Sequence, residues 1–233
     1  IDGEQASAKG IVVMNTPDAN ATTTAELTFA HILSLSRSLP KADKSVRSGK
    51  WERSKFMGAE LANKTLGMVG YGNIGRIVAS RAKAFKMKVV AYDPFVTPAV
   101  FEKEGVTPMA IDELARAADY ITLHCPANDK TRGIISAALI ATMKPTARII
   151  NVARGGLIDE QALYEAVKAG KIAGAALDVF ETEPPGESPL FELDNIVFTP
   201  HLGASTDEAQ LAAGTELARQ IAIYLQSGES INA

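Results

Sequence analysis

A glycine-rich loop between two apolar runs constrains the fold of this chain more than any other stretch. Gly70, Gly72 and Gly75 form a G-x-G-x-x-G pattern directly after the apolar run of residues 66–69. A helical pattern of apolar residues follows, and then a second apolar run, residues 89–92, ends at Asp93. This order predicts a β-α-β unit with a tight glycine turn at its first junction.

The three glycines and the aspartate of this unit each suit the binding of a dinucleotide. Gly70 allows the tight turn, Gly72 lets a pyrophosphate approach the backbone, and Gly75 lets helix and strand pack closely. The free N–H groups at the helix N-terminus attract phosphates. Asp93 is expected to accept hydrogen bonds from the adenosine ribose and to repel the extra phosphate of NADP. A glycine turn without a ligand is the alternative, but strand, helix, second strand and acid in register favour NAD as the cofactor.

The composition is that of an ordinary globular protein. Of 233 residues, 46% are hydrophobic and 22% charged, and the net charge of −3 argues against a general role at nucleic acids or membrane surfaces. No apolar run approaches the ~20 residues of a membrane helix. No cysteine–histidine cluster has metal-ligand spacing, so we expect no metal site. The single cysteine, Cys125, excludes an internal disulfide and fits a reducing cytosol, so we expect a cytoplasmic protein.

Beyond Asp93 the chain alternates between predicted helices and apolar strands. Strands are expected at residues 120–124, 148–152, 172–178 and 196–199. Helices are expected at residues 111–118, 136–143 and 159–169, and again after a capping box at Ser205-x-x-Glu208. Near-continuously apolar strands predict an α/β fold with a doubly wound parallel sheet of the Rossmann type. No stretch has the composition of a linker, so we predict one domain over residues 1–233.

The first 60 residues are expected to hold a short strand at residues 10–14 and then a long helix. A capping box, Thr23-x-x-Glu26, predicts that the helix begins there and runs to about Leu39. Its apolar residues surround most of the helix, which indicates burial on two sides and favours a partner subunit on the second side. His31, which lies among them, is expected to be a structural histidine with a hydrogen-bond partner.

Residues 41–55 are rich in lysine and arginine. A solvated helix face is the first interpretation. The alternative is a basic arm that carries cations to an anionic substrate. Trp51 is expected to pack against the rest of the chain and hold this segment in place.

Ligands of doubly wound sheets bind beyond the carboxyl ends of the strands, so the polar residues there are candidates for the site. They are Asp93, His124, Arg154, Asp178, Glu183 and His201. A guanidinium at Arg154 can hold a carboxylate in two parallel hydrogen bonds, or it can simply fix loops. His201 suits proton transfer near neutral pH, although a structural histidine before a helix is the alternative. A carboxylate at Glu181 or Glu183 can orient the imidazole, and spacing does not separate the two.

Four segments together resemble the D-isomer-specific 2-hydroxyacid dehydrogenase family. They are the glycine loop with Asp93, residues 151–156 (NVARGG), residues 177–185 (LDVFETEPP) and residues 201–206 (HLGAST). The resemblance implies that Arg154 binds the substrate's carboxylate and carbonyl oxygen. It implies that His201 accepts the hydroxyl proton as hydride passes to the nicotinamide, and that Glu183 is the residue that holds His201.

The resemblance covers essentially the whole chain and also implies cofactor contacts. Asp178 is expected to face the nicotinamide amide, Asn73 and Ile74 to lie along the pyrophosphate, and the residues after the strand at 120–124 to line the adenosine. The expected cofactor-binding residues are Gly70, Gly72, Asn73, Ile74, Gly75, Asp93, Pro94, His124, Cys125, Pro126, Thr131, Val152, Ala153, Arg154, Asp178, His201, Gly203 and Ala204.

Substrate and partners are also implied by the resemblance. Residues 9–17, 49–58 and 200–206 are most similar to members that act on a phosphorylated 2-hydroxy acid, whose phosphate Arg53 and Lys55 could bind. Two alternatives are a member acting on glycerate or glyoxylate and an NAD(H)-sensing, corepressor-like binding protein. The helix near residues 23–39 matches the family's dimer interface, so a homodimer or larger homo-oligomer is expected. Family members begin with a substrate domain expected to end near Ile1, so this chain is expected to bind NAD but to be inactive alone.

Overall fold

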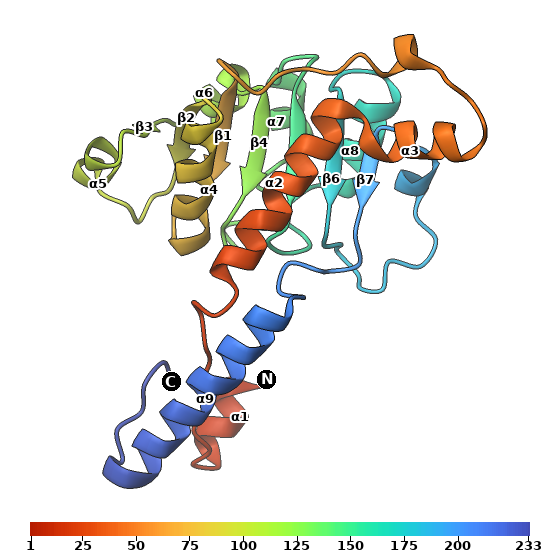
Figure 1. Ribbon diagram of the computed structural model, residues 1–233. Helices are drawn as coiled ribbons and strands as arrows, with labels where there is room; N and C mark the ends of the chain where they lie inside the picture. Colours follow the sequence, from red (N-terminus) through yellow and green to blue (C-terminus); the bar gives the residue numbers. More distant parts are fainter.

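The computed structural model describes residues 1–233 and has a seven-stranded parallel sheet at its centre (Figure 1). The strands are β1 (Thr65–Val69), β2 (Lys88–Tyr92), β3 (Thr107–Pro108), β4 (Tyr120–Leu123), β5 (Arg148–Asn151), β6 (Gly174–Leu177) and β7 (Ile196–Phe198). Their order is β3-β2-β1-β4-β5-β6-β7, and every neighbouring pair is parallel. The order reverses at β1, so the switch point where such sheets bind ligands lies between β1 and β4. The predicted doubly wound sheet is confirmed.

Helices cover both faces of this sheet. One core of 23 buried residues lies beneath α6 (Ile111–Ala117), α7 (Ala137–Thr142) and α8 (Glu160–Lys168). A second core of 20 buried residues lies beneath α2 (Ala21–Arg37), α4 (Asn73–Ala84) and α5 (Pro98–Lys103). Because a core lies on each face of the sheet, the central strands β1, β4, β5 and β6 are buried on both faces, which explains their uninterrupted apolar runs. None of the helices has the length and hydropathy of a membrane span.

The helices predicted after Asp93 are confirmed, with caps that differ in one place. The side chains of Ser136 and Asp159 cap α7 and α8, so these two residues precede the helices as N-caps. The last helix is α9 (Asp207–Ser227). Its N-cap is Thr206, one residue after the predicted Ser205, because the Thr206 side chain accepts the hydrogen bond from Ala209 N. The short α5 and β3 were not predicted.

The predicted capping box at the start of α2 is wrong. Asn20 is the N-cap residue, it makes no side-chain cap bond, and Thr23 lies inside the helix. Thr23 Oγ1 instead contacts Thr206 Oγ1 at 3.1 Å, and Glu26 forms an ion pair with Arg81 at 3.0 Å. Tertiary partners of these two side chains therefore replace the local bonds that the pattern predicts.

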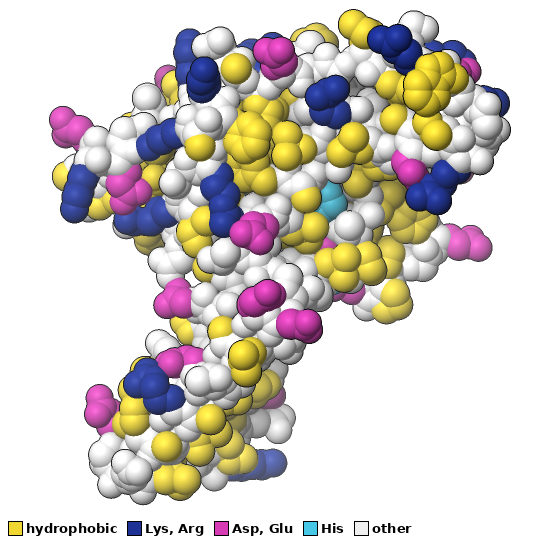
Figure 2. Space-filling model, in the orientation of Figure 1, with side chains coloured by type: hydrophobic (Ala, Val, Ile, Leu, Met, Phe, Trp, Pro, Cys, Tyr) yellow, Lys and Arg dark blue, Asp and Glu magenta, His cyan; other side chains and the backbone are white.

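The predicted strand at residues 10–14 is also wrong. A short helix, α1 (Gly3–Ala8), precedes it, and residues 11–16 form no regular element. Figure 1 shows α1 beside α9 in an arm that projects from the sheet, and Asn15 N donates to Asn232 O across it. A strand needs a neighbouring strand to pair with, and the arm offers only helices. Hydrophobic side chains gather on the surface of this arm (Figure 2); among the exposed ones are Ile11, Val12, Leu211, Leu217, Ile221 and Leu225.

Helix α2 ends before the predicted Leu39. Ser38 adopts a left-handed conformation with φ of 51°, and Leu39 and Pro40 then begin α3 (Leu39–Arg47). A 3-10 turn, η1 (Arg53–Phe56), follows, and a second, η2 (Pro189–Glu192), lies before β7. Trp51 is 78% exposed, so the expectation that it packs against this chain is wrong.

Candidate active site at the carboxyl edge of the sheet

The glycine loop has the backbone that its sequence requires. Gly70 has φ of 98°, and a Cβ there would lie 2.5 Å from the carbonyl oxygen of His124, so only glycine fits. Gly75 also packs closely, because its Cβ would lie 2.9 Å from Gly70 O. Around Gly72, in contrast, a Cβ would meet nothing within 4 Å. No side chain caps α4, so the N–H groups of its first turn are free to bind an anion.

Asp93 stands beside this loop at the end of β2 and holds it. Its Oδ2 accepts a hydrogen bond from Tyr71 N at 2.7 Å, and its Oδ1 accepts one from Phe95 N at 2.9 Å. Each carboxylate oxygen keeps a second lone pair, so ribose hydroxyls can still bind. The side chain of Asn73, in the first turn of α4, donates to Asp18, which brings the residues before α2 to the mouth of the loop.

The residues after β4 lie against the same loop. His124 Nε2 lies 3.1 Å from Thr122 Oγ1, while its Nδ1 is buried without a partner. Burial lowers the pKa of His124 to about 3, so its imidazole is neutral. Burial, with a smaller contribution from the charge of Asp93, raises the pKa of the Cys125 thiol to about 11. The Cys125 thiol is therefore protonated at neutral pH and is a poor nucleophile, and its expected contact with the cofactor stays a prediction.

Thr131 closes the loop that follows. Its hydroxyl donates to the carbonyl oxygen of Pro126 at 2.5 Å, and Asn128 N donates to Thr131 Oγ1 at 2.9 Å. These bonds fix the backbone near the expected adenosine site. The expected contact of Thr131 with the cofactor stays a prediction.

Arg154 is presented by a loop that a buried asparagine holds. Asn151 ends β5 and is 2% exposed; its amide donates to Arg154 O at 2.9 Å and accepts from Ala153 N at 3.0 Å. Gly155 lets this loop pack against the next one, because a Cβ there would overlap Phe180 O. The Arg154 side chain is exposed. Sequence reasoning missed Asn151, although a lone amide that ends an apolar strand is a detectable signal.

Asp178 holds the turn that carries His201. It is fully buried at the end of β6, and its carboxylate accepts three hydrogen bonds, which come from Thr199 Oγ1 (2.5 Å), Leu202 N (2.7 Å) and Gly203 N (2.8 Å). Its carbonyl oxygen accepts a fourth, from His201 N at 2.8 Å. The expected contact of Asp178 with the nicotinamide amide stays a prediction.

His201 is paired with a carboxylate. Its Nδ1 lies 2.7 Å from Glu183 Oε2, and Glu183 Oε1 accepts from Phe180 N at 3.1 Å. Partial burial opposes the charge of Glu183, but the hydrogen bonds from His201 and Phe180 and the nearby charge of Arg154 lower its pKa below the ordinary value. The effect of Arg154 places it within electrostatic range of the pair. Glu181 points elsewhere, 3.7 Å from Arg132, so the choice of Glu183 agrees with the geometry.

This arrangement is suited to acid–base chemistry on an anionic ligand. Because Glu183 engages Nδ1, Nε2 is the nitrogen of His201 that remains free to exchange a proton. His201 has φ of 54°, a conformation that costs energy for a residue with a side chain, and Asp178 keeps it there. The six polar residues predicted at the carboxyl ends of the strands do follow β2, β4, β5, β6 and β7.

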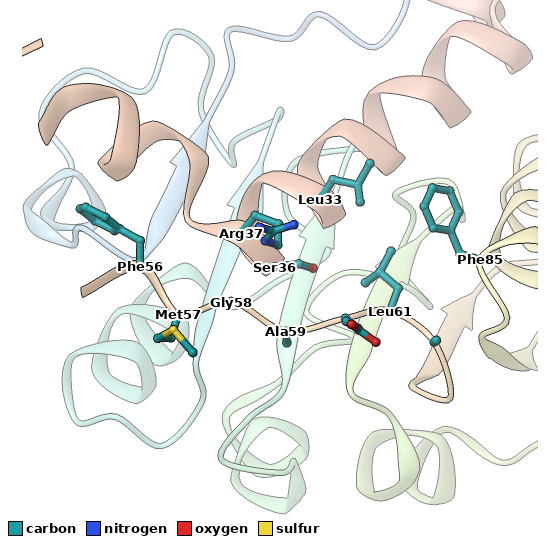
Figure 3. Close-up of a pocket in the computed structure, with 11 residues that line it drawn as sticks. Leu33, Ser36, Arg37, Phe56, Met57, Gly58, Ala59, Leu61 and Phe85 are labelled. Atoms are coloured by element: carbon teal, nitrogen blue, oxygen red, sulfur yellow. The ribbon is translucent and has the colours of Figure 1, made fainter. Parts of the chain in front are cut away.

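A separate hollow of about 570 Å³ lies between the C-terminal half of α2 and the segment before β1 (Figure 3). Leu33 and Arg37 of α2 line it together with Met57 and Leu61 of the segment before β1 and with Phe85. The close-up shows the side chains of Leu33, Leu61 and Phe85 at one end of the hollow and Met57 near the other. Seven of its 11 lining residues are hydrophobic, so it is an apolar groove and not part of the polar edge.

Comparison with known proteins agrees with these features. Residues 29–203 match the family described as D-isomer specific 2-hydroxyacid dehydrogenase, NAD binding domain. The D-3-phosphoglycerate dehydrogenase of Methanocaldococcus jannaschii is 54% identical over 222 residues, which are 95% of this chain and 42% of that protein. The human D-3-phosphoglycerate dehydrogenase is 46% identical over 231 residues, which are 99% of this chain and 43% of that protein. The chain thus spans less than half the length of these relatives.

Solved structures give the same result. A glyoxylate reductase from Paecilomyes thermophila has a TM-score of 0.92 at 34% identity and covers 100% of this chain, which corresponds to 70% of its own. D-lactate dehydrogenase from Aquifex aeolicus, complexed with NAD and lactic acid, has a TM-score of 0.88 at 33% identity, over 97% of this chain and 73% of its own. The chain belongs to the D-isomer-specific 2-hydroxyacid dehydrogenase family and contains that family's NAD-binding domain.

Proposed function

We propose that this chain is the NAD-binding part of a phosphoglycerate dehydrogenase, which oxidises D-3-phosphoglycerate to 3-phosphohydroxypyruvate, the first step of serine synthesis. The observation that carries the chemistry is the 2.7 Å contact between His201 Nδ1 and Glu183 beside Arg154, at the edge where the glycine loop opens. The substrate is supported by the relatives of that name at 54% and 46% identity.

The residues of the loop fit a bound dinucleotide. The open space at Gly72 and the free N–H groups of α4 suit a pyrophosphate, and the remaining lone pairs of Asp93 suit ribose hydroxyls. Bound NAD supplies the acceptor for the hydride. In this proposal, the first turn of α4 orients the cofactor and Asp93 disfavours the phosphate of NADP.

Three side chains bind the substrate and transfer its hydroxyl proton. Arg154 binds the carboxylate of the hydroxy acid in two parallel hydrogen bonds and polarises the oxygen on C2. Nε2 of His201 accepts the proton of the C2 hydroxyl as the hydride leaves C2. Glu183 accepts the Nδ1 hydrogen bond and stabilises the imidazolium that forms.

Neighbouring glutamates allow a matched test of this assignment. In the full-length gene product, Glu183→Gln should lower kcat for NADH production from D-3-phosphoglycerate at least about tenfold, because it removes the charge that stabilises protonated His201. Glu181→Gln makes the same change two residues away, beside Arg132, and should leave kcat within about twofold. Equal effects of the two substitutions would refute the role of Glu183. A profile in which glycerate or glyoxylate is turned over faster than the phosphorylated acid would refute the substrate.

The 233-residue chain alone is expected to bind NADH, but it is expected to produce little or no NADH from NAD and D-3-phosphoglycerate. Its relatives are more than twice its length, and closure of a second domain excludes water and aligns donor with acceptor. Rates equal to those of the full-length gene product would contradict this expectation.

A homodimer through the C-terminal half of α2 and the groove beside it is the assembly we propose. The apolar groove of about 570 Å³ and the exposed Met57 in its lining support this interface. Met57→Glu should shift the chain toward monomer in sedimentation velocity. Leu225→Glu is the control, since Leu225 is 77% exposed on α9, away from the groove. Dimers that persist in Met57→Glu would place the interface elsewhere.

A further inference from the structure

A buried histidine of α2 is left unused by the proposed hydride transfer. His31 is 2% exposed, and its Nε2 lies 3.0 Å from Thr199 Oγ1. The same Thr199 oxygen lies 2.5 Å from Asp178 Oδ1. Three side chains from α2 and from the ends of β7 and β6 therefore form one chain of hydrogen bonds. That chain ends on the carboxylate that holds the His201 turn.

Counting protons fixes the direction of both bonds. A carboxylate only accepts, so the single proton of the Thr199 hydroxyl is donated to Asp178. The hydroxyl has no second proton, so the bond between Thr199 and His31 must be donated by His31 Nε2–H. Burial lowers the pKa of His31, although the charge of Asp178 opposes this, and a neutral imidazole carries one N–H. The proton of His31 is thus on Nε2 and not on Nδ1.

We infer that His31, in its Nε2–H form, is a positioning residue that acts through Thr199 and Asp178 on the turn carrying His201. This inference rests on the proposed function, because it concerns how the proton-accepting histidine is held. By donating to Thr199, His31 keeps the Thr199 proton directed at Asp178. Hydrogen bonds in such a chain polarise and strengthen one another.

The turn depends on these contacts. His201 has a left-handed backbone, and Asp178 accepts hydrogen bonds from the N–H groups of residues 201, 202 and 203. Thr24 of α2 adds another tie, because its hydroxyl donates to Gly203 O at 2.9 Å. Without the His31 donor, the Thr199 hydroxyl can rotate away from Asp178. The carboxylate then loses one of its three donors, and the His201–Glu183 pair is less firmly positioned.

Substitutions at His31 and Thr199 separate this role from simple packing. His31→Leu fills much of the same space without a donor, whereas His31→Gln offers an amide N–H near the position of Nε2. In the full-length gene product, His31→Leu should lower kcat about threefold to tenfold, the range expected for one lost hydrogen bond, with KM for NAD unchanged. His31→Gln should recover kcat to within about twofold of the unaltered enzyme. Equal losses in the two variants, both folded, would overturn the inference.

A double-mutant cycle tests whether the effect passes through Thr199. Thr199→Val keeps the shape of threonine and removes both hydrogen bonds. If His31 acts through Thr199, His31→Leu causes no further loss of kcat in a Thr199→Val background. If the fold losses of kcat in the two single variants instead multiply in the double variant, His31 acts by another route, and the inference is overturned.

The protonation of His31 can be read without any turnover. The chain has three histidines, so long-range ¹H–¹⁵N spectra of the 233-residue chain, compared with His31→Gln, identify the His31 ring. The expected spectrum is that of a neutral Nε2–H imidazole at neutral pH; an Nδ1–H ring or an imidazolium would overturn the inference. The two proposals fail differently. Absence of NADH production by the unaltered enzyme counts against the proposed function, whereas the wrong ring nitrogen counts against the role of His31.

Discussion

Replacing Asp93 by asparagine is expected to reduce the preference for NAD over NADP. Both oxygens of the carboxylate accept backbone hydrogen bonds, Oδ2 from Tyr71 and Oδ1 from Phe95. Asparagine has one carbonyl oxygen, so its amide group must face one of these two N–H groups. Asp93→Asn therefore has two effects: it removes a negative charge, and it leaves one backbone donor of the cofactor loop without its acceptor.

The two effects act differently on the two cofactors. The unpaired donor disturbs the loop beneath either pyrophosphate and costs about 1 kcal/mol for both. The lost charge removes repulsion of the NADP phosphate. Two unit charges ~4 Å apart near a protein surface interact by about 4 kcal/mol, and solvent at the partly exposed Asp93 reduces this to about 1–2 kcal/mol. NADH also loses a charged acceptor for its ribose, worth about 1 kcal/mol. The NADH-to-NADPH affinity ratio should fall roughly thirtyfold to 150-fold.

Fluorescence titration of the 233-residue chain with NADH and with NADPH measures this ratio. Asp194→Asn is the matched control, because it removes the same charge from an exposed aspartate that precedes β7, at the opposite edge of the sheet. The control should leave both affinities unchanged. If Asp93→Asn and Asp194→Asn gave the same ratio, or if the unaltered chain bound both cofactors equally, Asp93 would not be the selecting residue.

Two further outcomes follow from the loops around the site. Gly155→Ala places a Cβ against Phe180 O, so the loops after β5 and β6 cannot both keep their positions. The midpoint of thermal unfolding should therefore fall by several degrees. An unchanged midpoint would contradict the close packing of the two loops. The folded-state pKa of Glu183 lies below its unfolded value, so its contribution to stability is present above about pH 4.5 and is lost as the pH falls through the folded-state pKa. In urea unfolding, the unaltered chain should therefore lose stability on acidification more steeply than Glu183→Gln, and parallel curves would contradict the contribution.

The parts of the fold that the sequence predicts are those encoded locally. The apolar runs of β1, β2, β4, β5, β6 and β7 and the glycines after β1 report directly on backbone and burial, so the sheet and the cofactor loop could be predicted. The same holds for side chains that immediately follow a strand, such as Asp93 after β2. Their shared position at one edge is a consequence of parallel strands alone.

What could not be predicted depends on partners that are distant in the sequence. Residues 10–14 have the composition of a strand, but no neighbouring strand is available to pair with them. Three consecutive threonines, residues 22–24, make the start of α2 ambiguous, and the contacts with Gly203 and Thr206 decide which role each takes. The side-chain hydrogen bonds of Asp178 come from residues 21 to 25 positions away in the sequence. The sequence therefore shows a charged residue after an apolar strand, but it does not show that this residue holds the turn of His201.

Helix α2 connects two regions that the sequence leaves unrelated. Its inner side is bonded to the turn of His201 at three points, through Thr23 to Thr206, Thr24 to Gly203 and His31 to Thr199. Its C-terminal half forms the apolar groove with residues 56–62. A helix of 17 residues moves as a rigid element, so a partner that presses on the groove cannot shift α2 without also moving the groups that hold this turn. If the groove is the subunit interface, assembly and the placement of the proton-accepting histidine are therefore mechanically linked through one helix.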